Sequence, residues 1–155
     1  MRFRQMKRIL CFFALLVSIL SGQVWRVSPT YSEMVETADL VAIVRLVGSQ
    51  DVESPNHFAD LPAGWRSRVQ PIDIELSVLA VLKGEEKNTA IRLYHYRVLP
   101  GRESIGDGLL HFDPGHLETF LVFLRRLGKD RYVPVTEQLL AFQSVLKLRI
   151  GEGPR

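Results

Sequence analysis

The densest group of side chains that could do chemistry lies in the sequence HFDPGHLE. Its candidates for metal binding or acid–base catalysis are His111, Asp113, His116 and Glu118. Imidazole and carboxylate groups are common zinc ligands, and two histidines four residues apart would share one face of a helix. Pro114 and Gly115 lie between these histidines and exclude a helix, so only a turn could bring them together. The segment is therefore either a metal site or a set of ordinary polar loop residues, and the second interpretation is favoured.

No other part of the chain suggests catalysis. The motifs G-x-S-x-G and H-E-x-x-H are both absent from the sequence. His57 and His95 lie in unrelated segments, and nothing in the sequence joins them. The only cysteine, Cys11, lies in a hydrophobic run near the N terminus, so the rest of the chain has no thiol ligand and no disulfide. We therefore expect no catalytic residue and no cofactor.

A second candidate region, residues 48–68, has the sequence GSQDVESPNHFADLPAGWRSR and no periodic apolar pattern. Loops of about 20 residues are longer than most connections and commonly carry function. Side chains suited to contact a partner are Phe58, Trp65, Arg66 and Arg68. The alternative, given equal weight, is that Trp65 packs back onto the domain as a plug.

The scaffold for these residues is a long predicted strand at residues 72–84, IDIELSVLAVLKG. Apolar residues occupy every even position from Ile72 to Leu82, and most odd positions are polar. This alternation is typical of a strand with one face in the core. Its length is roughly twice that of an average strand, which predicts bending around a barrel.

Shorter patterns predict the remaining elements. A short helix is expected at residues 29–37, capped by Ser28 and covering a strand at residues 119–126 that is apolar on both faces. Further strands are expected at residues 40–47, 90–98 and 132–135. A change of apolar phase near Leu93 predicts a bulge, and Pro134 indicates an edge strand. The C-terminal pattern fits a helix or an extended segment, and a helix at residues 144–149 is preferred.

The N-terminal residues indicate export. A basic stretch is followed by a twelve-residue hydrophobic run and then by Ser21 and Gly22. This pattern predicts a signal peptide at residues 1–22 and a single mature domain at residues 23–155. Because apolar residues after Gly22 could prolong the run, an uncleaved membrane anchor is the alternative. Without its four leader cations the net charge changes from +3 to −1, which argues against a nucleic-acid-binding surface.

Three motifs in the order ADLVAIV, VLAVLKG and FDPGHLETFLVFL carry a resemblance. They begin at Ala38, Val78 and Phe112, and their order resembles that of exported bacterial proteins similar to OB-fold modules of the tissue-inhibitor-of-metalloproteinases and netrin type. The resemblance implies a mainly β fold, a five-stranded OB-like Greek-key barrel with one or two short helices. Animal inhibitors of this type act through an N-terminal cysteine. The mature chain has none, so the resemblance implies the fold and not the inhibition.

Two functions follow from these patterns. The favoured one is a secreted or periplasmic, non-catalytic module that binds a protein or a cell-envelope component through residues 48–68 and 100–108. It would be attached to the membrane only if its N-terminal segment stayed uncleaved. The alternative is a metal-dependent hydrolase acting through His111, Asp113, His116 and Glu118.

Overall fold

The computed structural model describes residues 28–52, 61, 63–102, 109, 110, 112 and 118–148. The strands are β1 (Leu40–Asp51), β2 (Val69–Lys83), β3 (Ala90–Val98), β4 (Thr119–Arg126), β5 (Arg131–Pro134) and β6 (Val145–Leu148). The helices are α2 (Tyr31–Thr37) and α3 (Ala141–Ser144), with two short 3₁₀ helices, η2 (Ala63–Trp65) and η3 (Gln138–Leu140). The predicted signal peptide at residues 1–22 lies outside the described residues. Within the described ranges, no helix is long and apolar enough to span a bilayer.

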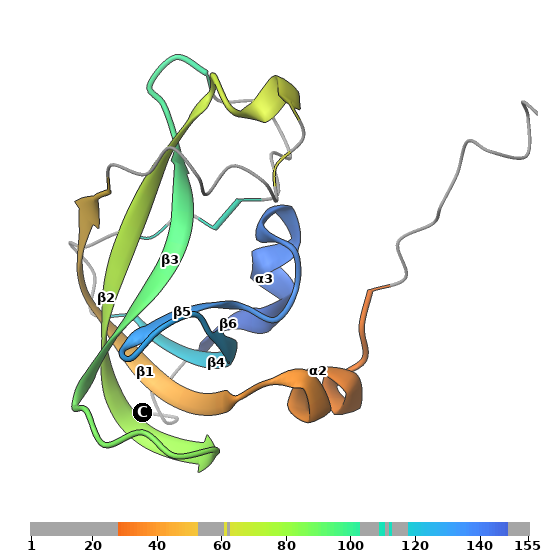
Figure 1. Cartoon of the computed structure of the whole chain (residues 1–155), viewed down its shortest axis with the longest axis vertical. Helices are drawn as coiled ribbons and strands as arrows, with labels where there is room; N and C mark the ends of the chain where they lie inside the picture. The colour runs from red at the N-terminus through yellow and green to blue at the C-terminus, as the bar shows by residue number, and fades with distance from the viewer. Residues whose placement is uncertain are drawn as a thin grey trace, which may run out of the picture.

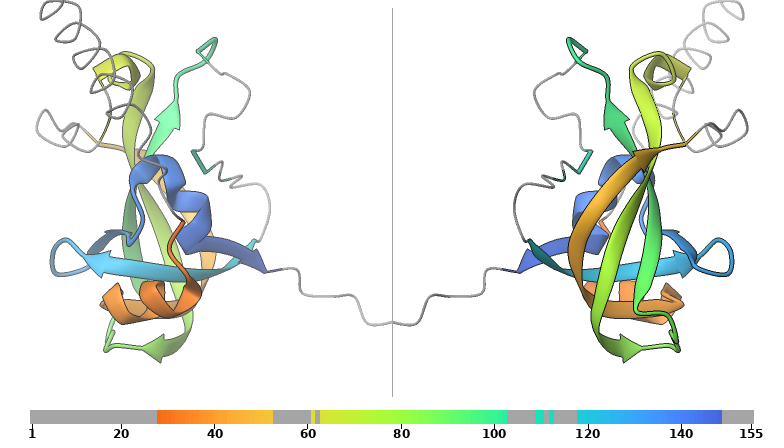
Figure 2. Two further views of the ribbon diagram at one scale, coloured as in Figure 1. Left: turned by 90° about the vertical axis from the view of Figure 1, so that its right-hand side faces the viewer. Right: turned by 90° about the vertical axis from the view of Figure 1, so that its left-hand side faces the viewer.

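The strands form a closed barrel (Figures 1 and 2). Its order is β1-β2-β3-β5-β4, and β4 pairs again with β1 to close the ring. Neighbouring strands run antiparallel except β3 and β5, which are parallel. The end of β4 pairs with β5, and its beginning pairs with β6. The predicted mainly β, five-stranded OB-like Greek-key barrel with two short helices is confirmed.

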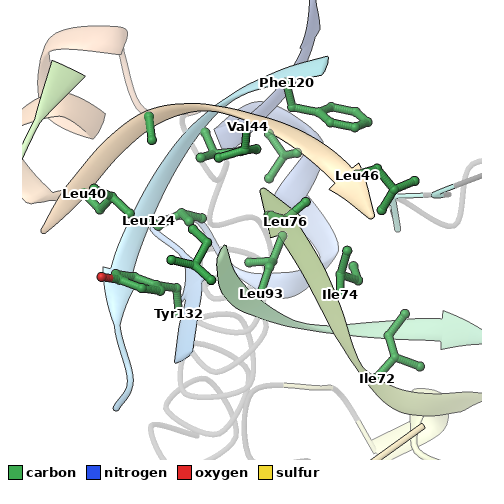
Figure 3. Close-up of a cluster of buried hydrophobic side chains, with 14 residues drawn as sticks. Leu40, Val44, Leu46, Ile72, Ile74, Leu76, Leu93, Phe120, Leu124 and Tyr132 are labelled. Atoms are coloured by element: carbon green, nitrogen blue, oxygen red, sulfur yellow. The ribbon is translucent and has the colours of Figure 1, made fainter. Parts of the chain in front are cut away.

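The inward faces of the strands fill the barrel with mainly aliphatic side chains, together with Phe120 and Tyr132 (Figure 3). Ile72, Ile74 and Leu76 are all buried, which confirms the predicted phase of the first half of β2. The prediction is wrong for the second half, because Ala80 and Leu82 are exposed. The reason is that β3 pairs with β2 only as far as Ser77, so the residues of β2 after Ser77 pair with β1 alone.

Helix α2 covers β4, as predicted. Met34 and Ala38 are buried in one cluster with Val41 and Phe123. The helix begins later than expected, because Thr30 and not Ser28 is its cap. The Thr30 hydroxyl accepts from the backbone N–H of Glu33, whose carboxylate accepts from Thr30 N at 2.7 Å. Hydrogen bonds from the Thr30 backbone and side chain lower the pKa of Glu33.

The ends of α2 and β2 are joined by Lys83 and Gly84. Lys83 Nζ donates to the carbonyl oxygens of Val35, Glu36 and Ala38 at 2.5, 3.1 and 2.7 Å, which satisfies carbonyls at the helix C terminus. Gly84 has a φ of 85°, and a Cβ added there would lie 2.1 Å from the carbonyl oxygen of Asp39. The first two motifs of the resemblance, far apart in sequence, therefore meet in space.

Two predicted features of β3 and β5 are wrong. The β2–β3 register runs without a shift, so there is no bulge at Leu93. The apolar phase changes because β3 is buried on both faces, with Leu93 in the barrel and Tyr94 in a second cluster outside it. The strand containing Pro134 is not at an edge, since β5 lies between β3 and β4.

The C-terminal helix was also predicted in the wrong place. The helix is α3, which ends at Ser144, and the following Val145–Leu148 is strand β6. This segment pairs with β4, where Val145 contributes to the barrel core. Pairing with a free strand edge therefore decided between the two conformations that the apolar pattern allowed.

Candidate functional site

The candidate contact surface lies at the end of the barrel where η2 follows the β1–β2 connection. We call it the arginine tip and define it as Trp65, Arg66, Arg68 and Arg102. The backbone N–H of Arg68 donates to Trp65 O at 2.9 Å and closes a turn. Arg68 Nη2 donates to Arg102 O at 2.7 Å, and Leu99 N donates to Arg68 O at 2.8 Å. The chain before β2 and the turn after β3 are thus bonded together.

Trp65 connects the arginine tip to the barrel. Its half-buried ring packs against the cluster outside the barrel, whose buried members are Leu61, Val69, Tyr94, Tyr96, Val98, Leu109 and Val133. The guanidinium carbon of Arg68 lies 5.1 Å from the centre of the Trp65 ring, and Arg66 is exposed. The position of Trp65 fits the plug alternative, while Arg66 presents its charge to solvent. Phe58, the fourth predicted contact residue, lies outside the described residues.

The start of the predicted loop also differs from expectation. β1 continues to Asp51, so residues 48–51 are strand and not loop. Near this strand end, Asp51 forms an ion pair of 2.7 Å with Arg97 of β3. Both side chains are more than half exposed, so the pair contributes little to stability.

The outer face of β2 and β3, which OB barrels commonly use for binding, is largely closed here. Tyr94 and Tyr96 are 3% and 0% exposed, with their rings 5.4 Å apart in an edge-to-face arrangement. Burial raises the pKa of the Tyr94 hydroxyl. The Arg131 guanidinium lies over the Tyr94 ring and forms an ion pair of 2.7 Å with the buried Asp73.

Arg92, which also lies on this face, is paired with carboxylates. Arg92 Nη2 contacts Asp130 Oδ1 at 2.8 Å, and its other terminal nitrogen lies 3.8 Å from Asp73 Oδ2. The hydrogen bond from Arg92 lowers the pKa of Asp130, and the same bond raises the pKa of Arg92. A polar hollow of about 230 Å³ beside Arg92 is therefore lined partly by groups that already neutralise one another. This leaves the arginine tip as the better candidate for contact with a partner.

A buried carboxylate, that of Glu86, lies in the connection between β2 and β3. The Tyr132 hydroxyl donates to Glu86 Oε2, and Arg126 Nη2 lies 3.4 Å from the same oxygen. Burial alone would raise the pKa of Glu86, but hydrogen bonds from Tyr132 and the Asn88 backbone hold it below its usual value. Burial raises the pKa of Tyr132. Near neutral pH the Glu86 carboxylate therefore stays ionised and the Tyr132 hydroxyl stays protonated, so the pair contributes to the structure and not to proton transfer.

His95 is fully buried with both ring nitrogens engaged. Its Nε2 accepts from the backbone N–H of Leu110 at 3.2 Å, so the neutral ring carries its proton on Nδ1. That nitrogen donates to Gln138 Oε1 at 2.7 Å. The amide nitrogen of Gln138 in turn donates to the carbonyl oxygen of Tyr94 at 3.3 Å. His95 therefore joins η3 and the segment at Leu110 to β3, a contact that no sequence pattern indicates.

The predicted metal ligands are not brought together by the described structure. His111, Asp113 and His116 lie outside it, and Glu118 forms an ion pair with Lys147 of β6. Among the residues that are described, no three His, Cys, Asp or Glu side chains are grouped so that they could hold a metal ion. Glu118 is thus engaged in joining the start of β4 to β6.

Sequence comparison adds no relative to this description. No protein-family model matches the chain, and no curated protein shows significant sequence similarity to it. The barrel and the bonded loops define a small OB-like protein whose outer β2–β3 face is filled by its own side chains. Its function must therefore be inferred from the surface that the fold presents.

Proposed function

We propose that the protein is an exported, non-catalytic binding module that contacts a protein or a cell-envelope component through the arginine tip. The observation that carries this proposal is the fixed position of Arg68, held between the Trp65 ring and the Arg102 carbonyl, with exposed Arg66 beside it. Aromatic and arginine side chains are enriched at protein interfaces. A guanidinium already fixed in place loses less conformational entropy on binding than a free one.

The N-terminal sequence supports the site of action. A basic start, a short hydrophobic run and two small residues are typical of a signal peptide, so the mature protein would be secreted or periplasmic. If the leader stayed attached, the same domain would be held at the membrane surface. Intact-mass measurement on the exported protein separates these cases, because a mature chain beginning near Gln23 is expected.

A relationship to exported bacterial modules of the tissue-inhibitor and netrin type is part of the proposal. It is supported by the OB-like strand order and by the contact between Ala38 of the first motif and Lys83 of the second. The hydrolase alternative has no comparable support, because the one predicted ligand within the described structure, Glu118, is bonded to Lys147.

The binding proposal is tested with single charge reversals at exposed arginines. We expect Arg66→Glu to weaken capture of a cell-envelope partner by about tenfold or more, which corresponds to roughly 1.4 kcal/mol. Arg125→Glu, an exposed arginine on β4 away from the arginine tip, is the matched control and should bind as wild type does. Trp65→Ala is a poorer probe, because the ring also packs on the barrel.

The measurement is capture by immobilised mature protein from envelope extracts, followed by quantification of each retained component. A component whose capture falls with Arg66→Glu and not with Arg125→Glu supports the proposal. Equal capture by both variants and wild type would rule out the arginine tip as the contact surface.

A further inference from the structure

A polar hollow lies between the β2–β3 connection and the turn that joins β4 to β5. We call it the lysine hollow, and its lining residues are Lys87, Asn88, Thr89, Ala90, Lys129 and Asp130. Its volume is about 510 Å³, within the range of small-molecule sites in proteins. Figure 1 shows the β2–β3 connection at the opposite end of the molecule from η2, so the lysine hollow is separate from the arginine tip.

Arg126 joins the two turns that form the lysine hollow. Its Nη1 donates to the carbonyl oxygen of Lys129 at 2.8 Å, and its Nη2 donates to the carbonyl oxygen of Glu85 at 3.1 Å. Within the β2–β3 connection, the backbone N–H of Asn88 donates to Glu86 Oε1 at 2.9 Å. These bonds fix the backbones of both turns before any ligand binds, which lowers the entropy cost of binding.

The carboxylate in the lining of the lysine hollow already has a partner. Asp130 Oδ1 forms an ion pair with Arg92 Nη2 at 2.8 Å, and the backbone N–H of Arg92 donates to the Asp130 carbonyl oxygen at 2.9 Å. The buried Glu86 pairs with Arg126, and Glu85 is not part of the lining. No carboxylate of the lining is therefore left to neutralise the two lysines.

Lys87 and Lys129 are the unpaired cations of the lysine hollow. Both are exposed, and within the described ranges neither ammonium group forms an ion pair or a hydrogen bond. One comes from each turn, so positive charges from two separate elements border the same space. An ammonium group binds phosphate as a compact point charge. A phosphate ester carries about two negative charges near neutral pH, which matches the two ammonium groups.

We propose that the lysine hollow binds a small phosphate ester, with its phosphate group between Lys87 and Lys129 and a hydroxylated organic part against Asn88 and Thr89. The side-chain amide and hydroxyl of these two lining residues can donate to and accept from hydroxyl groups. The hollow is larger than a phosphate ion, which leaves room for the organic part. The inference does not depend on the proposed function, because it uses no residue of the arginine tip.

Titration of the purified protein, followed by amide chemical shifts in NMR spectra, tests the proposal. The probes are inorganic phosphate and glycerol phosphate, each compared with sodium chloride at the same ionic strength. We expect both phosphates to give saturable shifts at residues 87–89 and at Lys129, and glycerol phosphate to bind at least about threefold more tightly because its hydroxyl groups add hydrogen bonds. The same shifts in sodium chloride would indicate charge screening alone and overturn the proposal. Equal affinity for the two phosphates would contradict an ester as the ligand.

Charge-removing variants show whether the two lysines are responsible. Lys87→Gln and Lys129→Gln should each weaken binding of glycerol phosphate by about fivefold or more, because each removes one charge-assisted hydrogen bond. Arg45→Gln removes an exposed cation on β1 and is the matched control, so its affinity should equal that of wild type. All three positions are exposed, so the melting temperature without ligand should change little. Equal affinities of the three variants would overturn the proposal.

One further variant separates this site from the arginine tip. Arg66→Glu, which tests the proposed function, should bind glycerol phosphate as wild type does, because η2 and the β2–β3 connection lie at opposite ends of the molecule (Figure 1). Loss of glycerol phosphate binding in this variant would place the phosphate at the arginine tip and contradict the proposal. Failure of partner capture by the arginine tip would leave the phosphate titration unaffected, so the two proposals can fail separately.

Discussion

Gly84→Ala is expected to be among the most destabilising single-methyl changes in the protein. Gly84 has a φ of 85°, which an alanine adopts at a cost of about 1–2 kcal/mol. The added Cβ would also meet the Asp39 carbonyl oxygen at 2.1 Å, and this oxygen belongs to the backbone and cannot rotate away. Overpacking that forces a backbone shift costs about 1–3 kcal/mol more. We therefore expect the free energy of unfolding to fall by about 2–5 kcal/mol.

Two other glycines separate the two causes. Gly101 has a φ of 73° but no atom within 4 Å of its added Cβ, so Gly101→Ala should cost only about 1–2 kcal/mol. Gly48 has neither a positive φ nor a close neighbour, so Gly48→Ala should change stability by less than about 1 kcal/mol. The predicted order of destabilisation is Gly84, then Gly101, then Gly48.

Urea unfolding of the three variants and wild type, followed by circular dichroism, measures these differences. The midpoints and slopes give each free energy of unfolding, and unchanged slopes show that the same structure unfolds. If Gly84→Ala and Gly101→Ala were equally destabilising, the close contact between the end of β2 and Asp39 would not exist in solution.

Three further predictions concern the interior. The pKa of Glu86 is lowered in the folded state, so the stability that its carboxylate contributes is present above the usual pKa of 4.5 and is lost as the pH falls through the folded pKa. The Glu86→Gln variant should therefore lose less free energy of unfolding than wild type between about pH 6 and pH 3, as measured by urea unfolding. His95→Phe leaves Leu110 N and Gln138 Oε1 without their present partner and should cost about 2–4 kcal/mol, with faster amide exchange at Leu110 measured by NMR. Ile74→Ala should lower the free energy of unfolding by about 2–5 kcal/mol in the same urea assay, because Ile74 is buried. Glu75→Ala, at the exposed neighbouring position, should lower it by less than about 0.5 kcal/mol, and equal losses would contradict the assigned phase of β2.

Regular local patterns predicted the barrel well. The alternation through Ile72, Ile74 and Leu76 identified the inner face of β2, because side chains two residues apart share one face of any strand. The same pattern failed at Ala80 and Leu82, where burial depends on whether a neighbouring strand continues alongside. Strand length in sequence does not reveal where the partner strand begins.

Features that depend on distant residues were not predictable. The C-terminal segment became strand β6 because β4 offers it a free edge, and no local residue signals this pairing. The bond between His95 and Gln138 joins residues 43 positions apart. For the candidate site, the sequence named Arg66 and Arg68 as contact candidates, but their position beside the chain after β3, shown by the hydrogen bond from Arg68 to the Arg102 carbonyl, required the closed barrel.

The most direct test of binding through the arginine tip is site-specific cross-linking. Cys11 is the only cysteine of the sequence, so in a chain beginning at Gln23 the substitutions Arg66→Cys and Arg125→Cys each introduce a unique thiol for a photoactivatable cross-linker. We predict that cross-linking in envelope extracts yields a discrete partner adduct from position 66, identified by mass spectrometry, and none of that mass from position 125. Identical adducts from the two positions, or an adduct from position 125 alone, would contradict the proposed function.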